Sequence, residues 1–88
     1  MYKHFFTKLS EKEFNRLTPS EAERVSERIK ALTAFPFPQN LNIKKMSRLE
    51  DSYRLRIGKM RIIFEIDHQK KIIVVRKIGY RGNVYSDL

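Results

Sequence analysis

Arginine side chains recur at short spacing in the second half of the chain, in a pattern that suits phosphate chemistry. Arg54 and Arg56 lie two residues apart in SYRLRI, where they alternate with apolar side chains, so both point to the same side of a strand. Arg61 follows a predicted tight turn at Gly58 and Lys59, and the register of such a hairpin places it beside Arg54 or Arg56. Like charges directly opposite each other destabilise a sheet. The arrangement therefore implies an anion, a partner or ample solvent on that face.

Two further residues lie just beyond the last predicted strand. Arg81 and Tyr85 belong to a polar tail that can return to the same face, which would gather four guanidiniums and a phenol. Guanidinium stays charged, donates hydrogen bonds in a planar fork and stacks on bases, so it suits RNA phosphates. Cleaving RNA without a metal needs a base for the 2′-hydroxyl, charge stabilisation at phosphorus and a proton for the leaving oxygen. The alternatives are a solvated strand face and a tyrosine that merely packs against the domain.

Other kinds of site find little support. His4 and His68 are far apart in sequence, and neither has a second ligand at metal-binding spacing. Glu50 and Asp51 are adjacent in a predicted loop, which does not suit a mechanism with paired carboxylates. The sequence has no phosphate-binding glycine loop and no GxSxG elbow. We therefore expect no metal and no cofactor.

The charge is strongly basic and unevenly spread. Nineteen Lys and Arg face ten Asp and Glu in 88 residues, which gives a net charge of +9. Residues 1–40 hold seven basic and five acidic side chains (+2), whereas residues 41–88 hold twelve and five (+7). Such a field attracts polyanions, although a basic surface can also serve solubility alone. With no cysteine, no signal peptide and no membrane-spanning run, the sequence predicts a cytoplasmic protein with no membrane partner.

The first forty residues predict a strand and two helices. The aromatic segment 2–9 is typical of a short strand, and Ser10 with Glu13 predicts a capping box that opens the first helix. Thr18, Pro19 and Glu21 predict a second start of the same kind. One apolar stripe then continues to the FPFP segment, which stops the helix, and it consists of Ala22, Val25, Ile29 and Leu32.

The remainder predicts a sheet. Segment 41–46 is a weak strand, and 52–57 and 60–66 alternate as two arms of a hairpin. Segment 71–78 is apolar on both faces at residues 72–75, as in a central strand. The tail, 79–88, is polar and irregular. The order predicts one α+β domain spanning 1–88, with an N-terminal strand and a helical hairpin packed on one face of a mostly antiparallel, twisted sheet of three or four strands.

The segments SYRLRIGKMRIIFEI and IGYRGNVY resemble the RelE/ParE toxin superfamily. The resemblance covers nearly the whole chain in element order, and its specific part is about the last 40 residues. It implies that Arg54 and Arg56 flank the RNA backbone and that Arg61 stabilises the transition state. It further implies that Arg81 is an acid or a charge stabiliser and that Tyr85 is the general base. Tyr80, which stands where a histidine is frequent in the family, is the alternative base.

The resemblance implies a toxin that acts beside an acidic antitoxin. RelE-like toxins cut messenger RNA in the ribosomal A site, and the retained arginines and tyrosine favour that activity, without a metal. Two alternatives stay open. One is a ParE-like protein that inhibits DNA gyrase without being an enzyme, and the other is an attenuated module that only binds nucleic acid or a partner.

Overall fold

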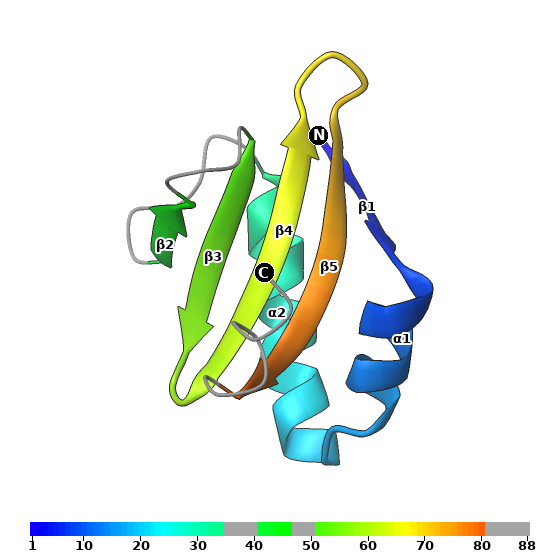
Figure 1. Ribbon diagram of the computed structural model, residues 1–88, viewed down its shortest axis with the longest axis vertical. Helices are drawn as coiled ribbons and strands as arrows, with labels where there is room; N and C mark the ends of the chain where they lie inside the picture. Colours follow the sequence, from blue (N-terminus) through cyan, green and yellow to red (C-terminus); the bar gives the residue numbers. More distant parts are fainter. Residues whose placement is uncertain (35–40, 47–50, 81–88) are drawn as a thin grey trace.

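One mixed sheet forms the centre of the protein. The computed structural model describes residues 1–34, 41–46 and 51–80, so the FPFP segment lies outside the described residues. The elements follow in the order β1 (Lys3–Phe6), α1 (Lys8–Asn15), α2 (Pro19–Thr33), β2 (Asn42–Lys45), β3 (Ser52–Ile57), β4 (Met60–Asp67) and β5 (Ile72–Tyr80). The described strands are arranged in the order β1-β5-β4-β3-β2 (Figure 1). The predicted α+β order is confirmed, and the sheet has one strand more than the upper number expected.

The predicted N-terminal strand joins this sheet at its edge. β1 runs parallel to β5, with Lys3 opposite Ile72 and Phe6 opposite Val75, whereas the other neighbouring strands are antiparallel. β5 is therefore an interior strand, as its apolar character on both faces predicted.

The core lies between α2 and one face of the sheet. The predicted stripe on α2 is confirmed for Val25, Ile29 and Leu32, which are buried, while Ala22 is half-buried. They pack on apolar side chains of three strands, namely Leu55, Ile57, Met60, Ile62, Phe64, Ile66, Ile73, Val75 and Ile78. Burying each such side chain contributes roughly 1.5–3 kcal/mol, so this layer is the main source of stability.

The first helix begins earlier than the sequence suggested. Its N-cap is Thr7, whose side chain accepts a hydrogen bond from the backbone N–H of Ser10. Ser10 lies inside the helix and is fully buried, and its hydroxyl donates to the carbonyl oxygen of Val75 at 2.6 Å. The predicted Ser10–Glu13 capping box is therefore wrong, because the serine hydroxyl is used in a tertiary hydrogen bond. The second capping box, Thr18 with Glu21, is confirmed.

α1 lies beside β5 where β1 ends, and α2 lies behind the sheet (Figure 1). Side chains of α1 satisfy the edge of β5: besides the Ser10 bond, Glu13 Oε1 accepts a hydrogen bond from the backbone N–H of Ile78 at 2.9 Å. Phe14 at the end of α1 and Leu17 just after it pack against the same core cluster as α2, so both helices cover one side of the sheet, as predicted. No helix of the described ranges is long and apolar enough to cross a membrane.

Candidate nucleic-acid interface

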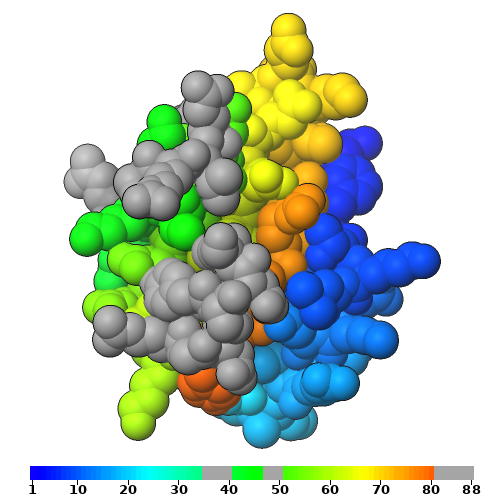
Figure 2. Space-filling view, in the orientation of Figure 1, coloured from blue at the N-terminus to red at the C-terminus, as the bar shows by residue number. Residues whose placement is uncertain are grey.

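Basic side chains gather on the face of the sheet opposite α2. Arg56 on β3 lies directly opposite Arg61 on β4, and Arg54 lies opposite Ile63. The predicted juxtaposition of Arg61 with this pair is confirmed. Ile63 is buried yet lies outside the core cluster, which agrees with the alternation that turns Arg61 and Ile63 away from α2. Figure 2 views the molecule from this side.

A turn of two residues sets this register. Ile57 pairs with Met60, and Gly58 between them adopts φ = 58°. A positive φ at the first central position is typical of type II′ hairpin turns and favours glycine. A longer turn would shift the pairing and separate Arg56 from Arg61.

Arg61 is held in place by the backbone of the turn that precedes it. The residue is only 5 % exposed, and its Nη1 donates to the carbonyl oxygens of Gly58 (3.2 Å) and Met60 (3.1 Å). Its Nε is buried without a hydrogen-bond partner. A buried N–H without an acceptor is costly, and an anionic oxygen would satisfy it. Arg61 is therefore a fixed cation whose Nε–H can still donate a hydrogen bond. Arg56, by contrast, is exposed to solvent.

Two other cations, which the sequence pattern did not predict, lie on this face. Lys44 on β2 lies directly opposite Arg54, so the two side chains share a face. Lys77 on β5 lies opposite Ile63 because β5 contains a bulge: Ile63 pairs with Lys77, but Phe64 pairs with Val75. Arg76 is the additional residue of β5 that has no opposite residue on β4. It reverses which side chains of β5 point to each face of the sheet from Lys77 onward. We refer to Lys44, Arg54, Arg56, Arg61 and Lys77 as the basic face.

Carboxylates neutralise part of this charge. Lys77 is 7 % exposed and its Nζ lies 3.9 Å from Glu13 Oε2 on α1. Arg76, at the bulge, lies 3.4 Å from Glu65 Oε1. Beyond Glu65 the same end of the sheet has a cavity of about 570 Å³ whose lining includes Asp51, Glu65 and Asp67. These carboxylates would repel phosphate, so the basic face ends there.

The other predicted site residues have different outcomes. Arg81 and Tyr85 lie outside the described residues, so their positions stay predictions. Tyr80, the alternative base, lies opposite Met60 of the core, and its hydroxyl donates a hydrogen bond to the carboxylate of Glu21 on α2. That bond raises the pKa of the Tyr80 phenol above its ordinary value of 10.0. The structure therefore argues against Tyr80 as the base, because its hydroxyl is turned away from the arginines and is harder to ionise.

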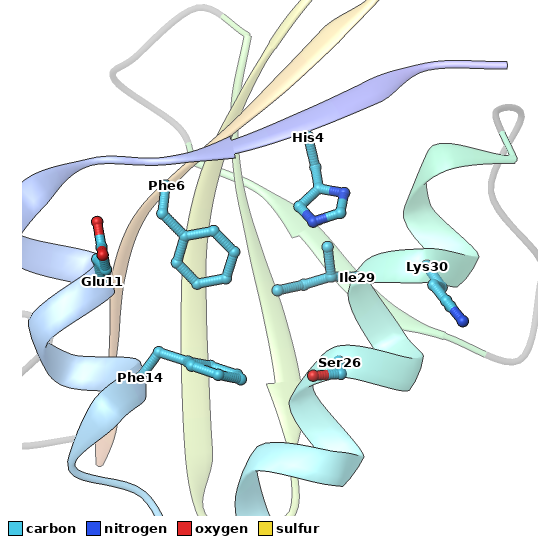
Figure 3. A pocket seen from close by; sticks show the side chains of 7 residues that line it. All are labelled: His4, Phe6, Glu11, Phe14, Ser26, Ile29 and Lys30. Carbon is cyan, nitrogen blue, oxygen red and sulfur yellow. The ribbon is translucent and has the colours of Figure 1, made fainter.

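A second cavity, of about 530 Å³, lies on the helix side of the sheet. It is formed by His4 and Phe6 of β1, Phe14 of α1 and Ile29 of α2, whose side chains surround it, with Glu11, Ser26 and Lys30 around them (Figure 3). None of the predicted site residues lines it. The larger part of its lining is apolar, so it does not suit a phosphate, and the basic face remains the candidate site.

Comparison with known proteins identifies the class. The family model described as the ParE toxin of type II toxin–antitoxin systems, parDE, matches residues 5–85. A protein of Methanocaldococcus jannaschii named "Putative toxin RelE1" is 32% identical over 77 residues, which are 86% of each chain. The chain thus belongs to the RelE/ParE toxin superfamily, and it is a RelE-like toxin of a toxin–antitoxin system.

Solved structures agree. A chain of the archaeal RelE–RelB complex from Pyrococcus horikoshii OT3 superposes with a TM-score of 0.80 at 26% identity, covering 94% of this chain and 98% of that one. The isolated RelE toxin of E. coli shares the fold, with a TM-score of 0.78 at 20% identity over 99% of this chain and 94% of that one.

Proposed function

We propose that this toxin is a ribosome-dependent endonuclease that cuts messenger RNA in the A site. The observation that carries the proposal is the Arg56–Arg61 pair: two guanidiniums face each other across β3 and β4, and one of them has a buried Nε without a partner. A phosphate at this pair would offset the repulsion between the charges and accept from that Nε. Ribosome and messenger RNA make the cytoplasm its place of action.

The chemistry we propose is attack of a 2′-oxygen on the adjacent phosphorus, without a metal. The 2′-hydroxyl loses its proton to Tyr85, the bond from the 2′-oxygen to phosphorus forms, and the bond to the 5′-oxygen breaks. Arg54 and Arg56 hold the RNA backbone, and Arg61 donates to the oxygens that become more negative in the transition state. Arg81 stabilises the negative charge on the leaving 5′-oxygen, which takes up a proton from water. The roles of Arg81 and Tyr85 rest on the family resemblance.

A phenol is a weak base at neutral pH, since its ordinary pKa is about 10. Neighbouring guanidiniums favour the phenolate, so Tyr85 becomes a competent base only if the tail brings it to the basic face. This requirement links the proposal to residues 81–88 and makes Tyr85→Phe an informative variant. We expect that variant to bind the ribosome and to lose most of the cleavage rate.

We further propose an antitoxin as the physiological partner, as in the RelE–RelB complexes that share the fold, and we expect this antitoxin to be acidic. A net charge of +9 favours rapid association with an acidic protein. Covering the basic face would also keep the toxin from RNA. A small acidic protein encoded beside this chain is the observation that would support this partner.

The description of the matching family names the ParE toxin. This name favours a second candidate function, inhibition of DNA gyrase without catalysis. An attenuated module that only binds nucleic acid is the third possibility. The three separate in one set of measurements. Primer extension on messenger RNA from translating extracts should show new ends within codons only when this protein is added. Trapping of gyrase on DNA with intact messenger RNA would establish the ParE-like function instead.

Growth provides the matching test in cells. Expression of the toxin alone should arrest growth and translation, and coexpression of its antitoxin should relieve the arrest. Arg61→Ala is the matched control, because it removes one proposed catalytic side chain. Unchanged growth and translation under strong expression of the folded wild-type protein would contradict an active toxin.

A further inference from the structure

The basic face contains a second pair of like charges, and one member of it, Lys44, has no role in the proposed reaction. Lys44 on β2 lies directly opposite Arg54 on β3, just as Arg56 lies opposite Arg61. Directly opposite residues of antiparallel strands have Cβ atoms about 5 Å apart, so an ammonium and a guanidinium share one place on the face. Ile43, the preceding residue on β2, packs against the core, which confirms that Lys44 points the other way.

The two pairs are regularly spaced. Arg54 and Arg56 are two residues apart on β3, so the pairs are separated by about 7 Å along the strand. Successive phosphates of an extended RNA strand have a similar separation. Beyond Arg54, the same row continues across the sheet to Ile63 and then Lys77. Lys77 lies 3.9 Å from Glu13, which offsets its charge, and the other cations of the row are the exposed Lys44 and the half-buried Arg54.

We propose that Lys44, together with Arg54, binds the RNA phosphate next to the one that is cleaved. This inference rests on the proposed function, and it adds a ligand and a direction to it: the RNA backbone runs along β3, with one phosphate at Arg56 and Arg61 and its neighbour at Lys44 and Arg54. The acidic lining near Glu65 lies one step further along β4 from Ile63 and limits the track. Lys44 is a binding residue in this scheme and takes no part in proton transfer.

The strand itself supplies a matched control. Lys45 is exposed like Lys44 and adjacent to it, but it lies opposite Tyr53, which packs against the core, and so it points to the other side. Lys44→Gln and Lys45→Gln therefore remove the same charge from the same strand on opposite faces. Both side chains are exposed, so both variants should keep the thermal stability of the wild type, which a melting curve checks.

The test uses a short RNA whose 2′-oxygens are all methylated, so that it binds without being cut. Its affinity for the full-length protein is measured by fluorescence anisotropy at several salt concentrations. We expect Lys44→Gln to weaken binding about 3- to 10-fold at low salt and to reduce the salt slope by about 0.7, the value for one phosphate on a single strand. Lys45→Gln should change neither quantity by a comparable amount.

A single neutral methylphosphonate, moved along the RNA, then locates the contact. At one linkage it should weaken binding to the wild type and have no further effect on Lys44→Gln, because the charge that it removes has already lost its partner. That linkage should be adjacent to the bond that the wild type cuts in the unmethylated RNA on the ribosome. Equal effects of Lys44→Gln and Lys45→Gln, additive effects at every linkage, or no binding by the wild type would overturn the inference.

The outcomes for the two proposals are distinct. If Lys44→Gln and the methylphosphonate are coupled but no RNA is cut on the ribosome, the phosphate site stands and the nuclease proposal fails. If RNA is cut and the two changes are additive, the nuclease stands and Lys44 has no such role.

Discussion

The hydroxyl of Tyr80, the last residue of β5, donates a hydrogen bond to the carboxylate of Glu21, in the first turn of α2. The same carboxylate accepts from the backbone N–H of Thr18 at 2.9 Å, so one side chain caps the helix and holds the end of the sheet. The bond from Tyr80, together with that from Thr18, lowers the pKa of Glu21 below its ordinary value of 4.5.

Tyr80→Phe should lower the melting temperature slightly and in a pH-dependent way. The lowered pKa of Glu21 stabilises the fold above pH 4.5, and this is lost as the pH falls through the folded-state pKa. The raised pKa of Tyr80 stabilises it below pH 10.0, and this is lost as the pH rises through the folded-state value. The difference between wild type and variant should therefore be largest between these limits. In an NMR titration the pKa of Glu21 should rise in the variant, and an unchanged value would contradict the bond.

Substitutions at Thr7 and Ser10 should distinguish the N-cap from the helix interior. At an N-cap glycine is tolerated better than alanine, whereas inside a helix it is worse by about 1 kcal/mol. We therefore expect Thr7→Gly to be more stable than Thr7→Ala, and Ser10→Gly to be less stable than Ser10→Ala. Ser10→Ala itself should cost about 1 kcal/mol through the lost bond to Val75. Ser26→Ala, at an exposed serine of α2, is the control. If Ser10→Gly were instead more stable than Ser10→Ala, Ser10 would be the N-cap of α1.

Arg56→Gln should stabilise the free toxin while it impairs RNA binding. The substitution removes one of two like charges that lie directly opposite each other, a repulsion of roughly 0.2–1 kcal/mol. The gain in free energy of unfolding should shrink at high salt, because Arg56 is exposed and screening is effective there. Chemical denaturation at two salt concentrations measures it, with Lys45→Gln as the control for net charge. A loss of stability on Arg56→Gln would show that the pair is not repulsive.

Arg61→Ala and Arg81→Ala should slow the chemical step far more than they weaken binding. Removing a donor that meets charge only in the transition state costs on the order of 100- to 1000-fold in rate. Lys70→Ala and Lys71→Ala, in the turn after β4, should affect the rate little. Single-turnover cleavage and ribosome affinity at one fixed salt concentration separate the effects. If the variants bind the ribosome more weakly but cleave at the wild-type rate once bound, both arginines serve binding only and not catalysis.

Cleavage should survive removal of divalent ions during the chemical step. The proposed reaction uses only guanidinium, phenol and water, so no ion is needed to activate the 2′-hydroxyl. Because ribosomes themselves need magnesium, the complex is assembled in magnesium, transferred to polyamines and then treated with EDTA. The single-turnover rate should stay within a few-fold of the untreated rate, and a rate restored only by added magnesium would contradict the mechanism.

The sequence by itself determined the elements and most of their order. The second capping box, the stripe on α2 and the hairpin of 52–57 with 60–66 depend on neighbours in the chain, and the structure confirms them. The same local pattern placed Arg54 and Arg56 on one side and brought Arg61 next to them. Side-chain alternation and a turn of two residues are enough to fix that much of the basic face.

Only the tertiary structure decided what depends on contacts between distant segments. The pairing of β1 with β5 turned Ser10 from a cap into a buried donor to Val75, 65 residues away. The bulge in β5 moved Lys77 to the basic face, and the pairing of β2 with β3 put Lys44 beside Arg54. The course of β5 likewise directs the side chain of Tyr80, its last residue, toward Glu21 on α2. Register between strands that are far apart in sequence is set by how the core packs and how edges are satisfied, and no local pattern contains that information.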